Sequence, residues 1–337
     1  MKSVFLEKAG KIYIKDIADK VCGEGEALIK VKSAGICGSD LGAFRGTNPL
    51  VNYPTVIGHE IAGEVIQIAK NERGIEVGDH VILDPYIYCG TCYPCSLGKT
   101  NCCESLMVLG VQTEGGMMEY RNHPTKLLHK VSSNLEWKVV PIVEPLCIAL
   151  HSLKQSEAKS GEHLVVIGAG PIGLLIAMAA LNYGVDPILI DIVEGRLDFA
   201  KKLGVKYTIN SDKTDAIKEI ALITKNLMAE CVIEASGSNA AIPKTLDFVS
   251  YAGRIVFTGW PKSPVEFATS VITKKELTIR GSRTSNAEFP EAVRLIENNI
   301  LDVRPLISKV IGFEELPAIF PLVNDNPMDF IKVIGIF

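Results

Sequence analysis

The chain has 337 residues, of which 47% are apolar and 22% are charged, and its formal net charge is -4 at pH 7. This length is enough for two domains, and the composition is that of an ordinary globular protein rather than a disordered or fibrous one. The slightly negative charge excludes a general attraction to nucleic acid or to anionic membranes, although local basic pockets could still accept an anionic substrate.

Two segments bear on where the protein is found. Met1–Lys8 contains neither an apolar stretch nor a small-residue cleavage site, so we expect no secretory signal and a cytoplasmic location. Leu164–Leu181 contains no charged residue, and a hydropathy window would mark it as a membrane span. Its glycines and Pro171 instead divide it into a short buried strand and a helix, so we expect no membrane span.

The first 150 residues have the pattern of a β-rich region with functional loops. Ala27–Lys32 alternates apolar and charged residues, as a half-buried strand does. Breaks follow at Gly35, Gly38, Gly46, Gly58 and Gly63. We therefore predict an all-β domain over residues 1–150.

Three short motifs in this region supply metal-binding side chains: Cys37, His59, Glu60 and Glu144. A single cysteine or histidine is commonly a core or turn residue, so the interpretation depends on their combination with the nucleotide-binding motif described below. An open zinc site uses three protein ligands and leaves a position for water or substrate. Such a site can polarise an alcohol oxygen.

Five of the nine cysteines lie between Cys89 and Cys103, in a chain without an export signal, which favours metal ligation over disulfides. Cys89, Cys92, Cys95 and Cys103 would form a closed tetrahedral zinc site that holds the loop. The alternative is an iron–sulfur cluster, but that motif continues with a cysteine after three residues and then proline. Cys102 could replace Cys103 as a ligand.

After His163 the pattern changes to alternating strands and helices. The predicted strands are Leu164–Ile167, Pro187–Ile192, Lys206–Ile209, Glu230–Glu234, Arg254–Thr258 and Glu276–Arg280, with helices over Gly195–Leu203 and Asp215–Thr224. This order predicts a doubly wound parallel sheet over residues 151–283. Residues 284–337, with a helix over Phe289–Asn298 and a strand-like run over Phe330–Phe337, are assigned to the first domain.

The first strand of this region leads into the pattern G-x-G-x-x-G. The motif follows an apolar strand and opens the predicted helix Ile172–Asn182, the context that a dinucleotide-binding turn requires. Its glycines allow a tight turn, close approach of the pyrophosphate, and packing of helix on strand. The helix N-terminus offers free N–H groups to phosphates. The candidate cofactor-binding residues here are Gly168, Gly170, Pro171, Ile172 and Gly173.

Asp191, at the end of the next strand, indicates which dinucleotide is bound. A carboxylate in this place accepts hydrogen bonds from the adenosine ribose and repels a 2′-phosphate, which favours NAD over NADP. Arg196 could cover the adenine, or it could be a solvated helix charge.

Taken together, the motifs resemble the zinc-containing medium-chain dehydrogenases. The shared features are, in chain order, Gly-Ile-Cys-Gly-Ser-Asp (35–40), Gly-His-Glu (58–60), Gly-Asp-His-Val (78–81), the four-cysteine loop, Gly115-Gly116, Glu144-Pro145 and Gly168–Gly173. Glu144-Pro145-Leu146 resembles the sorbitol dehydrogenase branch. Gly98–Cys103, Lys274–Leu277 and Gly281–Arg283 are most similar to bacterial L-galactonate, L-gulonate and L-idonate 5-dehydrogenases.

The resemblance implies a GroES-like catalytic domain and a Rossmann domain, with NAD, a catalytic zinc and a structural zinc in each subunit. It implies that Cys37 and His59 bind the catalytic zinc, with Glu144 or Glu60 as the third ligand. Ser39 would take the alcohol proton, and Arg283 would lie near the nicotinamide and the substrate.

Many relatives carry a histidine three residues after Ser39, whereas this chain has Gly42, so the proton must leave through the cofactor ribose, water or another residue. The alternative substrates are L-threonine, an alditol and an alditol phosphate. A nucleotide-binding protein without catalysis would lack a catalytic ligand, and none is missing here. Relatives form dimers or tetramers, so a homo-oligomer is expected.

Overall fold

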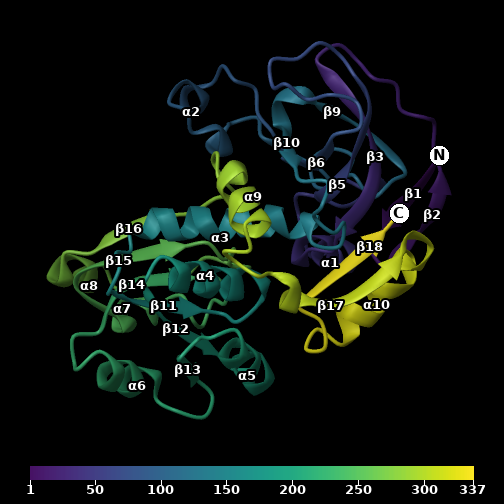
Figure 1. Ribbon diagram of the computed structural model, residues 1–337. Helices are drawn as coiled ribbons and strands as arrows, with labels where there is room; N and C mark the ends of the chain where they lie inside the picture. Colours follow the sequence, from purple (N-terminus) through teal and green to yellow (C-terminus); the bar gives the residue numbers. More distant parts are fainter. The chain divides into compact units, whose positions relative to one another are not determined.

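The computed structural model describes residues 1–337 and divides into two compact units (Figure 1). Unit 1 consists of Met1–Glu144 and Phe289–Phe337, and unit 2 of Pro145–Glu288. The sequence placed these boundaries after residues 150 and 283. The second boundary lies later in the chain because Glu288 belongs to unit 2, where its carboxylate accepts a hydrogen bond from His151 Nδ1 at 3.0 Å.

Unit 1 is built mainly from β-sheet. Its largest sheet has the strand order β10-β6-β5-β3-β18-β17, with β9 also paired to β3, and smaller sheets are formed by β2-β1-β4 and β7-β8. The strands are β1 (Lys2–Lys8), β2 (Lys11–Asp16), β3 (Glu26–Gly35), β4 (Thr55–Val56), β5 (Glu60–Ile68), β6 (His80–Leu83), β7 (Tyr86–Ile87), β8 (Met107–Val108), β9 (Tyr120–Pro124), β10 (Leu128–Val131), β17 (Ile307–Gly312) and β18 (Lys332–Ile336).

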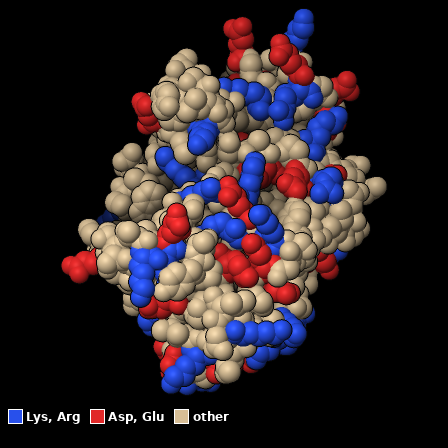
Figure 2. All heavy atoms as spheres, turned by 90° about the vertical axis from the view of Figure 1, so that its left-hand side faces the viewer, with Lys and Arg blue, Asp and Glu red and all other residues tan.

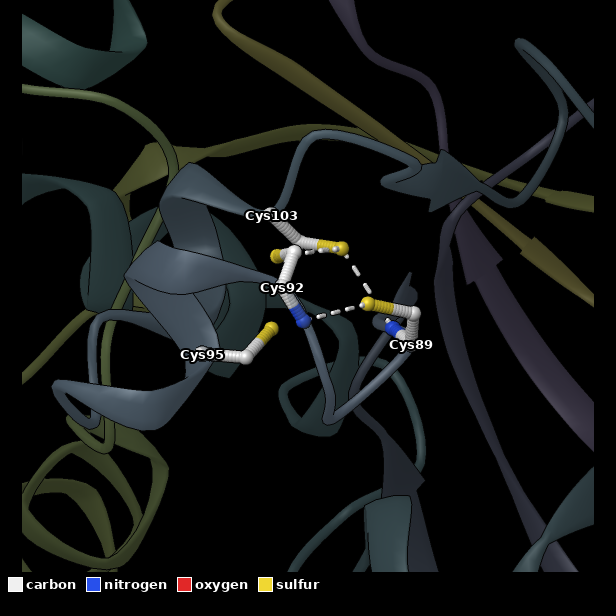
Figure 3. Close-up of side chains that lie close together, drawn as sticks. All are labelled: Cys89, Cys92, Cys95 and Cys103. Atoms are coloured by element: carbon white, nitrogen blue, oxygen red, sulfur yellow. Dashed lines mark hydrogen bonds between the residues drawn. The ribbon is translucent and has the colours of Figure 1, made fainter.

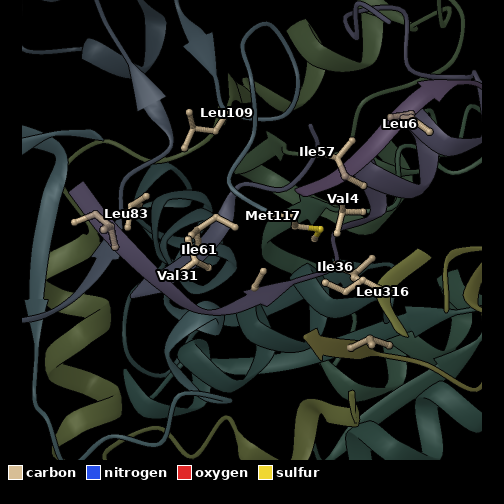
Figure 4. Close-up of a cluster of buried hydrophobic side chains, with 14 of the residues drawn as sticks. Val4, Leu6, Val31, Ile36, Ile57, Ile61, Leu83, Leu109, Met117 and Leu316 are labelled. Carbon is tan, nitrogen blue, oxygen red and sulfur yellow. The ribbon is translucent and has the colours of Figure 1, made fainter. Parts of the chain in front are cut away.

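Strand β3 is the centre of the large sheet and shows why the sheet forms here. Ala27, Ile29 and Val31 are buried, while Lys30 between them is exposed, as the alternation of side chains along a strand requires. The buried side chains enter one core together with Val4, Leu6, Ile57, Ile61, Leu83, Leu109, Met117 and Leu316 (Figure 4). The predicted strand over Ala27–Lys32 is confirmed, and it is longer than expected.

Unit 1 also contains helices that the all-β prediction for residues 1–150 missed. α1 (Gly38–Arg45) begins after Cys37 as N-cap and ends at Gly46, which has φ 76°. Asp40 accepts a hydrogen bond from the Cys37 backbone N–H at 2.9 Å and so caps the first turn. Closely spaced glycines are typical of loops, but here Gly38 and Gly42 lie within a short helix. A second helix of this region, α2 (Tyr93–Ser96), was also missed. In the C-terminal segment, α9 (Phe289–Glu297) confirms the predicted helix over Phe289–Asn298, and α10 (Leu316–Asp325) follows it. Short 3-10 turns lie at Thr100–Cys102, Thr125–Leu127, Val140–Ile142, Arg304–Leu306 and Phe313–Glu315.

The C-terminal segment completes the large sheet of unit 1. β18 pairs antiparallel with β3 and parallel with β17, so the last strand of the chain lies beside one of the first. In this register Ile334 is opposite Gly35, and Lys332 lies just beyond the end of the paired segment. The predicted strand-like run over Phe330–Phe337 is confirmed, and it brings Lys332 into unit 1.

Unit 2 is a six-stranded sheet in the order β13-β12-β11-β14-β15-β16, and all its neighbouring strands are parallel. The strands are β11 (His163–Ile167), β12 (Asp186–Asp191), β13 (Tyr207–Asn210), β14 (Ala229–Glu234), β15 (Val249–Phe257) and β16 (Thr278–Gly281). The helices are α3 (Val143–Ser156), whose first two residues belong to unit 1, α4 (Pro171–Asn182), α5 (Glu194–Lys202), α6 (Ala216–Ile223), α7 (Thr245–Phe248) and α8 (Thr269–Lys275). This confirms the predicted doubly wound Rossmann sheet.

The segment Leu164–Leu181, which has no charged residue, forms a strand and a helix, as expected. β11 is paired on both sides in the sheet, and α4 has 12 residues. No helix of the structure has the length and apolarity needed to cross a bilayer. On the face shown in Figure 2, basic and acidic side chains are interspersed.

His123 in β9 should make the stability of the protein depend on pH. Its side chain is fully buried beside Asp84, whose backbone oxygen lies 2.8 Å from Nε2, and burial lowers the pKa of His123 to about 3. In the unfolded chain the pKa of histidine is about 6.5, so this contribution to stability is complete above pH 6.5 and is lost as the pH falls toward 3. At pH 5 the loss is about 2 kcal/mol. Urea unfolding at pH 7.5 and pH 5 measures it, and an equal pH dependence in His123→Gln would contradict the assignment.

Candidate metal and dinucleotide sites

Cys37, His59 and Glu60 meet in unit 1, with their ligand atoms all within 4.8 Å of one another. Cys37 precedes α1, while His59 and Glu60 lie at the start of β5. The register explains the meeting, because Gly35 at the end of β3 is opposite Glu60. A Cβ at Gly35 would lie 1.9 Å from Glu60 Oε2, so only glycine leaves room for this carboxylate.

The two ring nitrogens of His59 face different neighbours, Asp40 and Ser39. Its Nδ1 is 3.7 Å from Asp40 Oδ1, and its Nε2 is 3.4 Å from Ser39 Oγ. Burial lowers the pKa of His59, but Asp40 and Cys37 outweigh that effect and hold the pKa well above its usual value. A carboxylate behind a ligating imidazole is the usual support of a metal-bound histidine. The sequence analysis assigned no role to Asp40.

Glu60 forms a buried ion pair with Lys332 of the C-terminal strand. The distance from Lys332 Nζ to Glu60 Oε1 is 2.5 Å, and the Ile36 carbonyl accepts a second hydrogen bond from the ammonium at 3.3 Å. Lys332 is 4% exposed and Glu60 is fully buried. Burial disfavours the charged lysine, yet Glu60 and Cys37 raise its pKa. Sequence reasoning missed Lys332, whose only signal is a single charge in an apolar strand.

Glu144 stands at the start of α3 and is also fully buried. Its Oε1 accepts a hydrogen bond from the Tyr86 hydroxyl group. Burial raises the pKa of Glu144 to about 7, against the pull of His59. Glu144 lies outside the group of three ligand atoms within 4.8 Å, although the charges of His59 and Glu60 act on it.

These residues fit a divalent metal ion. The second oxygens of the two glutamates, Glu60 Oε2 and Glu144 Oε2, are buried and have no hydrogen-bond partner. A buried carboxylate oxygen without a partner is costly and calls for an explanation. Cysteine, histidine and carboxylate are the donors that a catalytic zinc takes, so zinc held by Cys37, His59 and one or both glutamates would supply what these oxygens lack.

The four predicted cysteines of the loop also meet. The sulfur atoms of Cys89, Cys92, Cys95 and Cys103 lie within 4.8 Å of one another and point toward a common centre (Figure 3). Cys103 is buried in this cluster, whereas Cys102 is exposed and lies outside it. No cysteine of the chain forms a disulfide.

The electrostatics of the cysteine cluster also fit a cation. Backbone N–H groups of Thr91 and Cys92 donate to Cys89 Sγ, both at 3.4 Å, and lower the pKa of Cys89 to about 6. Burial and the neighbouring Cys92 raise the pKa of Cys95 to about 12. Cys89 is therefore ready to bind as a thiolate, whereas Cys95 needs a nearby cation in order to ionise. Four sulfur ligands suit a closed tetrahedral zinc.

Replacing Cys103 with serine should remove the structural zinc. The expected result is a loss of about one zinc equivalent per chain and a lower melting temperature, because metal binding at such a site contributes directly to folding. Zinc content by atomic emission and a thermal melt measure the two effects. The exposed neighbour provides the control, since Cys102→Ser should keep all its zinc; zinc loss in that variant instead would make Cys102 the ligand.

In unit 2 the glycine-rich turn has the geometry that its sequence predicts. Gly168 has φ 103°, and its N–H donates to the Ile190 carbonyl at 2.7 Å. A Cβ at Gly173 would lie 1.8 Å from Gly168 O, so a side chain there would separate helix and strand. Space beside Gly170 is open, and α4 begins after it with Pro171 and then Ile172. The free N–H groups of this helix start are available to phosphates.

Asp191 ends β12 next to this turn. Its Oδ2 accepts a hydrogen bond from the Ala169 N–H at 2.6 Å, and its Oδ1 accepts from the Val193 N–H at 2.9 Å. Arg196 Nη1 lies 3.9 Å from the same carboxylate. The structure thus brings Arg196 to Asp191 in an ion pair, which is more than a solvated helix charge.

Glu234, at the end of β14, is a site residue that sequence reasoning missed. It is fully buried, and its Oε1 accepts from the backbone N–H groups of Ser236 and Gly237 at 2.9 and 3.0 Å. A Cβ at Gly168 would lie 3.0 Å from Ser236 Cβ, so this loop lies against the glycine-rich turn. Glu234 therefore holds the loop that lies beside the glycine-rich turn. Its position at the carboxyl end of a parallel strand was the available signal.

The remaining predicted residues lie apart from these clusters or at their edges. Ser39 is half-buried beside His59, and Arg283 is exposed just after β16 of unit 2. Gly42 is buried within α1 and offers no group to carry a proton.

Comparison with known proteins identifies the family to which the chain belongs. Residues 23–133 match the family model of the alcohol dehydrogenase GroES-like domain, and residues 171–298 match that of the zinc-binding dehydrogenases. A zinc-type alcohol dehydrogenase-like protein of Haemophilus influenzae is 50% identical over 100% of this chain and 99% of its own length.

Two further relatives carry information on ligands. L-Galactonate-5-dehydrogenase of Escherichia coli is 31% identical, covering 94% of this chain and 93% of its own. A crystal structure of an alcohol dehydrogenase of Escherichia coli CFT073, complexed with the cofactor NADH, superposes with a TM-score of 0.94 at 32% identity, covering 100% of this chain and 99% of that one.

Proposed function

Because the chain belongs to the zinc-binding dehydrogenases, oxidoreductases that act on CH–OH groups, we propose that it oxidises a secondary alcohol of a sugar acid or polyol with NAD. The observation that carries the proposal is the group of half-buried Cys37 with buried His59 and Glu60, together with the unpartnered oxygens Glu60 Oε2 and Glu144 Oε2. A structural role alone would not require a thiol, an imidazole and a carboxylate together in this arrangement.

The residues of unit 1 would bind and orient the alcohol. Cys37, His59 and Glu60 or Glu144 would hold a catalytic zinc, which supplies Lewis-acid polarisation of the alcohol oxygen when it is bound. Asp40, whose Oδ1 lies 3.7 Å from His59 Nδ1, would support the ring from the side away from the metal. The Ser39 hydroxyl, 3.4 Å from His59 Nε2, would accept the proton of the alcohol.

The reaction balances as the transfer of one hydride and one proton. The carbinol would lose its C–H electron pair as a hydride, which bound NAD would accept, giving a ketone and NADH. The hydroxyl proton passes to Ser39 and then to solvent through water or the cofactor ribose, because Gly42 provides no relay.

The choice of NAD is supported by Asp191, whose carboxylate would accept hydrogen bonds from the ribose and repel a 2′-phosphate. The relative with bound NADH points the same way. Gly168, Gly170 and Gly173 with the start of α4 would receive the pyrophosphate.

For the substrate we propose a hexonate oxidised at carbon 5, with Arg283 as the contact for its carboxylate. The support is the L-galactonate-5-dehydrogenase relative together with the position of Arg283, an exposed residue just beyond β16. We also propose that the enzyme works in the cytoplasm as a homodimer or homotetramer.

The test is the reduction of NAD, followed at 340 nm, with hexonates, alditols, alditol phosphates and L-threonine, each with and without a chelator. We expect turnover of a hexonate that the chelator abolishes and that Arg283→Gln weakens mainly through KM. Turnover of L-threonine, an alditol or an alditol phosphate alone would keep the reaction class and overturn the substrate. No turnover across the panel by zinc-loaded protein would overturn the proposal.

A further inference from the structure

We propose that Tyr86 is a positioning residue for the catalytic metal, because its phenol holds one oxygen of Glu144 and thereby leaves the other oxygen available to the metal. The inference rests on the proposed function, since it requires a metal ion beside Cys37, His59 and Glu60. It identifies Tyr86 as part of the support of this site.

The hydrogen bond itself is the first observation. Tyr86 Oη donates to Glu144 Oε1, and both side chains are buried, Tyr86 with 5% and Glu144 with 0% exposed. The other oxygen, Glu144 Oε2, is buried without a partner. Because the phenol satisfies Oε1, the carboxylate cannot rotate without losing that bond. Oε2 is therefore the oxygen left for a ligand.

The second observation is how firmly Tyr86 itself is held. It lies in β7, where it is opposite Val108 of β8, and its N–H donates to Asp84 Oδ1 at 3.0 Å. The segment between β7 and β8 carries Cys89, Cys92, Cys95 and Cys103. A metal bound by those sulfurs would therefore fix the loop whose base places the phenol against Glu144.

The third observation is the difference between the two glutamates. The donor to Glu60 is the ammonium group of Lys332, whereas the donor to Glu144 is a neutral phenol. Lys332 offsets the charge of Glu60, so Glu60 is balanced before any metal binds. The phenol orients Glu144 without supplying a positive charge, so a cation is the partner that this carboxylate still lacks. The two glutamates therefore differ as metal ligands, because one is paired with a cation and the other with a neutral donor. The placement of Glu144 depends on the single hydroxyl group of Tyr86.

The experiment replaces that hydroxyl alone, with Tyr86→Phe. Cobalt(II) is placed in the catalytic site of the full-length protein, its visible absorption spectrum is recorded, and its affinity is measured by competition with a chelator. We expect about a 10–100-fold weaker affinity and an altered spectrum, the range observed when a supporting group of a metal ligand is removed. NADH binding and the structural zinc should remain as in the parent.

Tyr13→Phe is the matched control, because Tyr13 Oη donates to Glu7 Oε2 at 2.7 Å near the surface of the same unit. It should leave affinity and spectrum unchanged. A double-mutant cycle adds Glu144→Gln, in whose background Tyr86→Phe should have little further effect on affinity.

If Tyr86→Phe binds cobalt with the affinity and spectrum of the parent, the inference is overturned, whether or not its melting temperature falls. Equal losses from Tyr86→Phe with and without Glu144→Gln would overturn it as well, because the phenol would then act independently of Glu144. A parent protein that takes up no metal at this site would overturn the proposed function first, and the inference with it.

Discussion

Replacing Lys332 with methionine should lower the free energy of unfolding by about 3–5 kcal/mol. Glu60 is fully buried and its Oε1 lies 2.5 Å from Lys332 Nζ, so the variant leaves an uncompensated charge in the interior. Urea unfolding at pH 7.5 of protein without metal in the Cys37, His59 and Glu60 group measures the loss. We also expect weaker binding of the catalytic metal, because Glu60 can no longer hold its orientation.

Two variants test this reasoning. Lys32→Met breaks a Lys–Glu pair of the same sheet, 3.0 Å from Glu64 but partly exposed, and should cost less than about 1 kcal/mol. The double variant Glu60→Gln with Lys332→Met removes both charges and should recover much of the lost stability. A double variant as unstable as Lys332→Met alone would contradict the ion-pair explanation.

Cys37→Ser should lower kcat/KM by at least about a thousandfold, since it removes a thiolate from the proposed catalytic zinc site. NADH binding should persist because the glycine-rich turn and Asp191 belong to unit 2. Zinc content should fall by about one equivalent, with the structural zinc retained. Steady-state kinetics, NADH fluorescence titration and metal analysis measure these three effects.

Cys22→Ser is the control for this variant. Cys22 is also a free thiol of unit 1, and it donates to the Glu26 carbonyl at 3.3 Å outside the metal group. Its activity and zinc content should equal those of the parent. Wild-type turnover by Cys37→Ser would refute the assignment of Cys37 as a ligand.

Much of unit 2 could be predicted because its signals are local. Short apolar runs, a helix after a glycine-rich turn, and an acid at the end of the second strand each follow from a few neighbouring residues. The structure has these elements within a few residues of the predicted bounds, except that β15 begins at Val249, earlier than Arg254. The four-cysteine cluster could also be predicted from local sequence, since all its sulfur atoms come from one short segment.

The fold class, the zinc-dehydrogenase family and the side chains that could bind metal and dinucleotide can therefore be inferred from the order of residues alone. The residues that support those side chains become visible only in the folded chain. Lys332 and Glu60 are 272 positions apart, and Tyr86 and Glu144 are 58 apart. Such pairs depend on how β18 joins β3 and where β7 and α3 place their side chains, and these are long-range contacts that no local periodicity encodes.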